Sequence, residues 1–200
     1  MSYSSITLDV TDGLARVALN QPALGNPFNE AFCDDWLTLA NDLTSRSGIR
    51  AILLTANGKY FSVGGDIGMF ARNLDELPML IKKWTAALHM GIARMARIDA
   101  PIVAAVHGSA MGGAVALIAS CDLVYAARSA VFGAAYSSIG YSCDAGASFA
   151  LASRMGVARA RRFLLLAEIL KAEQAQQLGL VDDLCDDDKL LAETEAAAVR

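Results

Sequence analysis

The sequence lacks the features that mark several special classes of protein. Its 4 cysteines form no C-x-x-C pair and no cluster with metal-ligand spacing, so we expect free thiols in a reducing compartment and no metal site. No run of Lys or Arg occurs and the net charge is −4, which argues against a nucleic-acid partner. The N-terminal residues carry acids and no apolar segment typical of a secretory signal, so the expected location is cytoplasmic.

Long hydrophobic runs are also scarce. The longest, residues 102–119, contains a histidine, a serine and three glycines, which favours a strand, a turn and a helix over a membrane span. What the chain does have is 54% hydrophobic and 19% charged residues, the balance of a globular protein, and its 200 residues fit one domain. We therefore expect residues 1–200 to form a single domain with no membrane partner.

The apolar periodicity changes repeatedly between that of strands and that of helices, which predicts an α/β domain of repeated β-β-α turns. Residues on either side of a Thr-Asp-Gly turn alternate in polarity and predict a β-hairpin. Asp66 and Asp144 each precede a predicted helix and can cap it. The expected strands are 5–10, 14–20, 51–55, 102–106, 122–126, 130–132 and 180–184, and the expected helices are 29–45, 67–72, 78–97, 112–119, 144–154, 158–166, 171–178 and one from 186 onward.

Two glycine-containing turns carry the strongest signal for a site. Residues 61–66 (FSVGGD) and 108–113 (GSAMGG) each follow a buried strand and precede a helix, so both are expected at one edge of the same sheet. Backbone N–H groups at a helix start have no partner within the helix. Two such groups brought together form an oxyanion hole, which stabilises an enolate or a tetrahedral intermediate.

Four blocks of the sequence, FSVGGDI, PIVAAVHGSAMGGAVALIASCDLVYAA, VFGAAYSSIGYSCDAGASFALASRMG and AEQAQQLGLVDDL, occur in an order that resembles the enoyl-CoA hydratase/isomerase (crotonase) superfamily. The resemblance implies a crotonase/ClpP-like spiral of repeated β-β-α units, assembled as a homotrimer or a dimer of trimers. It also implies an acyl-CoA substrate, with coenzyme A entering as part of that substrate and no tightly bound cofactor. Family members usually continue with further helices, so residues 1–185 are expected to form the spiral core and 186–200 the start of a C-terminal helical region that is mostly lacking.

The resemblance places the oxyanion hole by position. It implies that the backbone N–H groups of Val63 and Gly113 bind the thioester carbonyl. The loop after the hairpin and the first glycine turn are implied to hold the adenine end of coenzyme A. The residues implied to contact the substrate are Ala23, Leu24, Gly64, Gly65, Asp66, Gly112 and Tyr136, and apolar residues such as Met69, Phe70, Ile81 and Tyr141 are expected to line the acyl pocket.

The chain departs from a hydratase at both expected glutamates. Hydratases of this family carry one glutamate three residues after the second oxyanion glycine and another after the following extended segment, where the two activate and deliver water. Ala116 and Tyr136 occupy these positions here. Neither side chain transfers a proton at neutral pH as a carboxylate does, so hydration of simple enoyl-CoA thioesters is expected to be absent or very slow.

Asp144 offers a different carboxylate. It stands where isomerase-like members of the family carry an acid facing the acyl group. One carboxylate beside a thioester enolate can take a proton from one carbon and return it to another, which is double-bond isomerisation. The leading hypothesis is therefore an enoyl-CoA isomerase with Asp144 as acid and base.

His89 supports an alternative. It aligns with the histidine that activates water in 4-chlorobenzoyl-CoA dehalogenase, where an aspartate aligned with Asp144 is the nucleophile and a tryptophan at the position of Tyr136 supports it. Asp144 and His89 would then give a dehalogenase or a thioester hydrolase. A third alternative is a non-catalytic acyl-CoA-binding member of the family, because the hydratase glutamates are missing.

Two further residues near the second turn are assigned other roles. His107 is expected to bond the backbone of the turn rather than the substrate. In ClpP-type peptidases, which share the spiral fold, a serine nucleophile immediately precedes the methionine of this turn, and Ala110 occupies that position here. Serine hydrolysis is therefore disfavoured.

Overall fold

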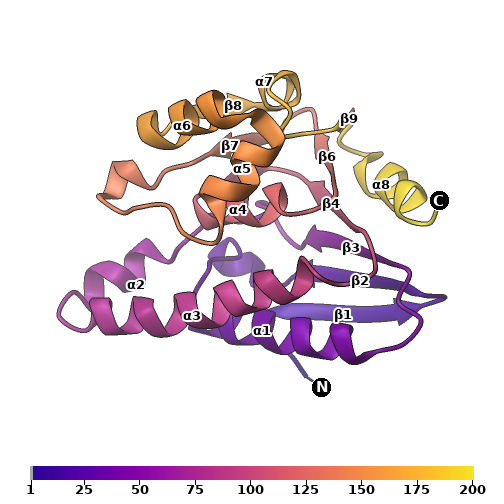
Figure 1. The fold of residues 1–200 in the computed structure, drawn as a ribbon, viewed down its shortest axis with the longest axis horizontal. Helices are drawn as coiled ribbons and strands as arrows, with labels where there is room; N and C mark the ends of the chain where they lie inside the picture. The colour runs from indigo at the N-terminus through magenta and orange to yellow at the C-terminus, as the bar shows by residue number, and fades with distance from the viewer. Residues whose placement is uncertain (1) are drawn as a thin grey trace.

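The computed structural model describes residues 2–200 and contains two β-sheets (Figure 1). The larger sheet has six strands in the order β1-β2-β3-β4-β6-β9, and the smaller has three in the order β5-β7-β8. In the larger sheet β1 and β2 are antiparallel, and all other neighbours are parallel. The strands are β1 (Ile6–Thr11), β2 (Leu14–Leu19), β3 (Ala51–Ala56), β4 (Ile102–Val106), β5 (Ser109–Met111), β6 (Leu123–Ala127), β7 (Val131–Gly133), β8 (Ile169–Lys171) and β9 (Asp183–Cys185).

Helices connect the strands and cover the sheets, so the expected α/β class is confirmed. The helices are α1 (Glu30–Ser45), α2 (Ile67–Arg72), α3 (Leu77–Met95), α4 (Gly113–Ala119), α5 (Ala147–Met155), α6 (Val157–Leu166), α7 (Ala172–Gln177) and α8 (Leu190–Ala198), with short 3₁₀ turns η1 (Pro22–Leu24) and η2 (Ser137–Ile139). Within residues 2–200, no helix combines the length and the apolar character needed to span a membrane.

Most predicted elements are confirmed, including the N-terminal hairpin and the two helix starts at Asn29 and Asp66. The Asn29 side chain accepts the N–H of Phe32 at 3.0 Å, and the Asp66 side chain accepts that of Met69 at 2.8 Å. Three predictions need correction. The last helix begins at Leu190 rather than near residue 186, and the last strand is Asp183–Cys185 rather than 180–184. Strands β5 and β8 are absent from the sequence prediction, because segments of three residues show no clear periodic pattern.

Helices α1 and α3 pack closely side by side along the larger sheet (Figure 1). Gly91 allows this approach, because a Cβ atom there would lie 2.6 Å from Trp36 Cδ1 and 3.2 Å from the backbone of Leu37. The Trp36 side chain is almost fully buried between the helix and the sheet. This packing fixes α3, and α3 in turn carries one wall of the pocket described below.

Strand β4 and helix α4 form the centre of the molecule. Every residue in both elements is buried. In Figure 1, α4 lies between the N-terminal half of the chain and helices α5 and α6. On the opposite face of the larger sheet, a separate apolar cluster joins Leu14, Leu53 and Val103 to Ala198 of α8. An ion pair between Arg16 and Glu195 also ties α8 to the sheet.

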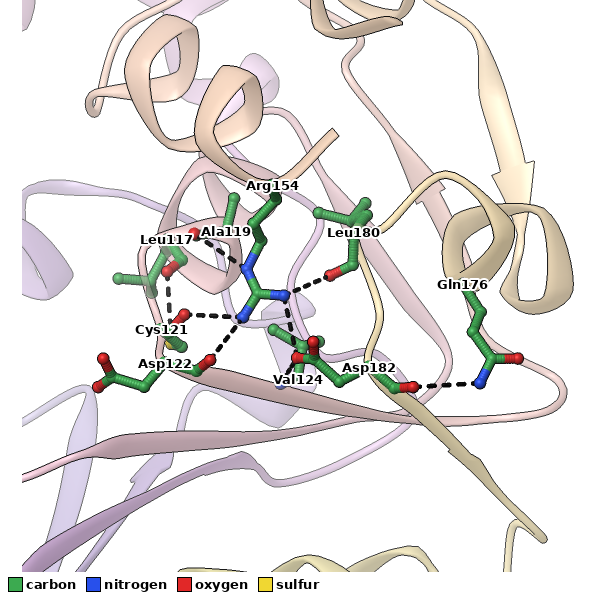
Figure 2. A network of polar contacts seen from close by, with 9 residues as sticks. All are labelled: Leu117, Ala119, Cys121, Asp122, Val124, Arg154, Gln176, Leu180 and Asp182. Carbon is green, nitrogen blue, oxygen red and sulfur yellow. Dashed lines mark hydrogen bonds and ion pairs between the residues drawn. The ribbon is translucent and has the colours of Figure 1, made fainter. Parts of the chain in front are cut away.

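Arg154, at the end of α5, joins α4 to the start of β6 and to the loop before β9 (Figure 2). Its guanidinium donates to the carbonyl oxygens of Cys121 at 2.9 Å and Asp122 at 3.0 Å, and pairs with Asp182 at 2.9 Å. Longer bonds reach the carbonyls of Ala119 and Leu180. A cation is favourable here because it lies at the C-terminal end of α4, where carbonyls lack helical partners.

We expect Arg154→Met to lower the free energy of unfolding by about 2–4 kcal/mol, because the carbonyl groups of Cys121 and Asp122 lose their donor and Asp182 loses its ion-pair partner. Urea denaturation measures this change. The matched control is Arg162→Met, which breaks the more exposed pair with Glu168 and is expected to cost about 0–1 kcal/mol. Equal effects of the two substitutions would show that the Arg154 network contributes no more than a surface ion pair.

Candidate functional site

The two glycine turns lie side by side, as the sequence predicts. The Ser62 N–H donates to Ser109 O at 3.0 Å, and the Met111 N–H donates to Ser62 O at 3.1 Å. Gly64 has a φ of +81°, and a Cβ atom there would lie 2.6 Å from Met111 O. Only glycine fits such a close approach in that conformation. The backbone of the first turn is therefore held against the second.

Gly65 and Gly113 each contribute a free backbone N–H group to these turns. Gly113 is the first residue of α4, so its N–H has no partner within the helix. Neither of these two N–H groups donates a hydrogen bond to any of the described residues. The Val63 N–H, in contrast, donates to Gly25 O at 3.0 Å. The prediction of Val63 as a donor to the substrate therefore disagrees with this structure, and Gly65 is the residue of the first turn that lines the pocket with an unengaged N–H.

The sequence does not reveal which amide of the first turn is free. Val63, Gly64 and Gly65 are consecutive, and only the folded loop determines where each N–H points. The Gly64 N–H is also engaged, by the Ser62 hydroxyl at 3.1 Å. The one signal in the sequence is that residue 65 is a glycine. The structure gives a reason for it, because a Cβ atom there would lie 3.0 Å from the Phe70 ring.

A pocket opens in front of these two amides and encloses a volume of about 140 Å³. Its walls come from both glycine turns, from α2 and α3, and from the loop that precedes α5. Most of its lining is apolar or aromatic, as is typical of small-molecule sites. The lining residues are Phe28, Cys33, Val63, Gly65, Ile67, Phe70, Ile81, Trp84, Thr85, Leu88, Gly112, Gly113, Ala135, Tyr136, Ile139, Tyr141, Ser142 and Asp144.

The pocket brings together most of the residues expected from the sequence. Phe70, Ile81 and Tyr141 line it as predicted for the acyl pocket, but Met69 does not. Asp144 is the one charged residue among the lining residues of the described chain. Any acid–base chemistry in this pocket therefore centres on Asp144.

Tyr136 holds the Asp144 side chain. The Tyr136 hydroxyl donates to Asp144 Oδ1 at 3.0 Å, and among the described residues Asp144 Oδ2 has no hydrogen-bond partner. Burial, with the neighbouring Asp144 carboxylate adding to it, raises the pKa of Tyr136. The phenol therefore stays protonated and acts as a donor, which leaves Oδ2 as the oxygen free to act on a ligand.

Asp144 does not cap α5, so that expectation is wrong. Helix α5 begins at Ala147 after Gly146, and no side chain caps it. The backbone carbonyl of Asp144 accepts the Ala147 N–H at 2.8 Å, while its side chain turns toward Tyr136. Gly146 adopts a left-handed conformation with a φ of +74°, which lets the chain turn into the helix without a side-chain cap.

His89 lies behind Asp144 and outside the pocket. Its Nε2 atom accepts the backbone N–H of Ala145 at 2.9 Å, which requires a neutral imidazole with the proton on Nδ1. His89 instead lines a separate hollow with residues of α3, α4 and α5. The expectation of His89 as a base acting on the substrate therefore disagrees with this arrangement. The histidine holds the peptide next to the carboxylate instead.

Three other residues near the site have defined positions in the structure. His107 Nε2 donates to Gly58 O at 2.9 Å, so it bonds backbone as expected, but in the loop before the first glycine turn rather than in its own turn. Ala116 is fully buried within α4. Cys33 lines the pocket, but burial, with smaller effects from the carboxylates of Asp34 and Asp144, raises its pKa to about 12. Its thiol is therefore protonated at neutral pH and is a poor nucleophile.

A second hollow adjoins the pocket on the outer side of the first glycine turn. Val63, Gly65 and Ile67 line both, so the two are neighbours. The second hollow also includes Leu24 and Asp66, which the resemblance assigns to the adenine end of coenzyme A, but not Ala23 or Gly64. The remaining residues of its lining are Pro27 and Gly68.

We expect His89→Leu to lower the free energy of unfolding by about 1–2 kcal/mol, because the buried Ala145 N–H loses its acceptor. Urea denaturation at neutral pH gives the difference. His89→Gln is the matched control, since its side-chain oxygen can still accept that N–H and the loss should be smaller. If the two variants are equally stable, the hydrogen bond to Ala145 has no measurable role.

Comparisons with known proteins agree with this geometry. The family model described as Enoyl-CoA hydratase/isomerase matches residues 9–200. A trans-2-decenoyl-[acyl-carrier-protein] isomerase of Streptococcus mutans is 29% identical over 202 residues, covering 100% of this chain and 76% of its own length. A probable enoyl-CoA hydratase of Rhodobacter capsulatus is 35% identical over 181 residues, covering 90% of this chain and 68% of its own length.

The fold is also similar to solved structures. The crystal structure of a putative enoyl-CoA hydratase from Streptomyces coelicolor superposes with a TM-score of 0.93 at 25% sequence identity, covering 100% of this chain and 73% of that one. The spiral of β-β-α units implied by the sequence is thus confirmed. The chain belongs to the enoyl-CoA hydratase/isomerase family, within the crotonase superfamily.

Proposed function

We propose that this protein isomerises the double bond of an enoyl-CoA thioester. The observation that carries the proposal is that, among residues 2–200, Asp144 is the single carboxylate that lines the pocket, beside two backbone N–H groups without partners. A single group can move a proton between two carbons of the same substrate, whereas family hydratases use two glutamates to add water.

The N–H groups of Gly65 and Gly113 form the oxyanion hole in this proposal. Both residues line the pocket, and neither N–H is engaged within the described chain. Hydrogen bonds to the thioester oxygen strengthen as negative charge develops on it, and each such donor lowers the barrier by about 3–4 kcal/mol. The adjoining hollow around Leu24 and Asp66 gives the coenzyme A portion a place outside the acyl pocket.

Asp144 supplies the proton transfers. Its Oδ2 removes a proton from C2 of the 3-enoyl thioester, the carbon between the carbonyl and the double bond, and the released electron pair moves into the carbonyl group and places negative charge on the thioester oxygen. The resulting dienolate takes the same proton back at the other end of the system, so the double bond shifts and no atom is gained or lost. Tyr136 holds Oδ1 throughout and keeps the carboxylate in one orientation.

The position of His89 does not support the alternative of a dehalogenase or a thioester hydrolase. A base that activates water must reach the pocket, and His89 Nε2 is instead occupied by the Ala145 N–H. Assembly as a homotrimer or a dimer of trimers, without a tightly bound cofactor, stays a prediction of the family resemblance. Exposed apolar side chains such as Phe149, Leu165 and Ile169 offer a surface for that assembly.

The proposal is tested with trans-3-enoyl-CoA and crotonyl-CoA substrates. The protein should convert 3-enoyl thioesters to 2-enoyl thioesters, seen as a rise in absorbance of the conjugated product, and should hydrate crotonyl-CoA very slowly. Asp144→Asn removes the base while retaining a similar shape, and we expect kcat to fall by about 10³-fold or more because proton abstraction is lost. Full activity in this variant, or rapid hydration of crotonyl-CoA, would contradict the proposal. Binding of thioesters without any turnover would favour the non-catalytic alternative.

A second substitution tests the role of Tyr136. Tyr136→Phe removes only the hydroxyl that donates to Asp144 Oδ1, so we expect kcat to fall about tenfold while KM changes little. The matched control is Tyr141→Phe, which removes a hydroxyl from the same pocket without touching Asp144. A loss confined to KM, or equal losses in both variants, would show that Tyr136 does not position the carboxylate.

A further inference from the structure

Aromatic side chains are concentrated in the pocket. They make up 7% of the whole sequence, yet five of the 18 lining residues are aromatic. These rings come from four separate places in the chain, namely the loop before α1, helix α2, helix α3 and the loop before α5. The five residues are Phe28, Phe70, Trp84, Tyr136 and Tyr141.

Three of the rings form one continuous wall. The Phe70 ring stacks on Tyr141 with centroids 5.7 Å apart and an interplanar angle of 23°. The same ring meets Trp84 at 6.5 Å and 32°. Phe70 also lies against Gly65, because a Cβ atom there would be 3.0 Å from the ring. The aromatic wall therefore begins directly beside the amide that we assign to the thioester oxygen.

The wall is not simply part of the core. Trp84 is almost fully buried, but Phe70 and Tyr141 are only partly buried and keep ring surface open to the pocket. A ligand can cover this remaining surface. Planar rings that stack offset or edge-to-face gain about 0.5–1.5 kcal/mol per pair beyond the area that they bury, and a flexible alkyl chain gains only the burial.

We propose that the acyl group of the substrate carries an aromatic ring close to the thioester, as an aryl-alkenoyl thioester of coenzyme A does. The ring lies against Phe70 and Tyr141, within reach of Asp144. This inference rests on the proposed function for the orientation of the thioester, and it adds the chemical class of the acyl group. An adjacent ring also conjugates with a dienolate and stabilises it.

The test measures binding, so it does not depend on turnover. Isothermal calorimetry compares phenylacetyl-CoA with octanoyl-CoA, which has the same number of acyl carbons. We expect phenylacetyl-CoA to bind about tenfold more tightly. Phe70→Leu should reduce this ratio to about one, because it weakens the binding of phenylacetyl-CoA. The affinity for octanoyl-CoA should change less than twofold, which shows that the pocket remains folded.

The matched control is Leu74→Ala. Leu74 is an exposed apolar residue just after α2 that does not line the pocket, so the ratio should stay at the wild-type value. Octanoyl-CoA binding as tightly as phenylacetyl-CoA, or a ratio unchanged in Phe70→Leu, would overturn the inference and leave the isomerase proposal intact. If instead the Asp144→Asn variant were fully active, the isomerase proposal would fail, and the binding ratio would still be the evidence for an aromatic acyl group.

Discussion

The hydrogen bonds between Ser62 and strand β5 are the constraint on which the site depends. They hold two turns, separated by about fifty residues of sequence, at backbone contact distance, and Gly64 makes that contact possible. Each turn alone offers an unpartnered amide, which is a common feature of helix starts. The pair becomes a site only because the two amides, those of Gly65 and Gly113, open into the same pocket.

Helix α4 keeps the second turn in place, and its two ends are anchored in different ways. At its start, the Gly112 N–H donates to Gly133 O at 2.8 Å, which ties the turn to the smaller sheet. At its end, the Arg154 guanidinium donates hydrogen bonds to the carbonyl oxygens of Ala119, the last residue of the helix, and of Cys121 just after it (Figure 2). A fully buried helix of seven residues has little stability of its own, so these contacts and the surrounding core determine its position.

The sequence predicts the scaffold better than the directions of single groups. Apolar periodicity and capping residues are local signals, and they locate most helices and strands, including the Asp66 cap. The donor at Val63, the cap at Asp144 and the base at His89 each disagree with the structure, because each group has a hydrogen-bond partner that the surrounding sequence pattern does not specify. The Val63 N–H donates to Gly25 O and the Tyr136 hydroxyl donates to Asp144 Oδ1. The Ala145 N–H donates to His89 Nε2. No local pattern encodes those contacts.

The two departures from the hydratase pattern act together in the proposed reaction. Ala116 removes one carboxylate from the buried helix, and Tyr136 replaces the other with a donor whose raised pKa keeps it protonated. The remaining carboxylate, Asp144, then has one oxygen held by Tyr136 and one oxygen free. Such a group can remove and return a proton, but no second carboxylate among the described residues lines the pocket to direct water onto the double bond. An apolar, ring-lined pocket strengthens this bias, because it offers few hydrogen-bonding groups to order a water molecule beside the substrate.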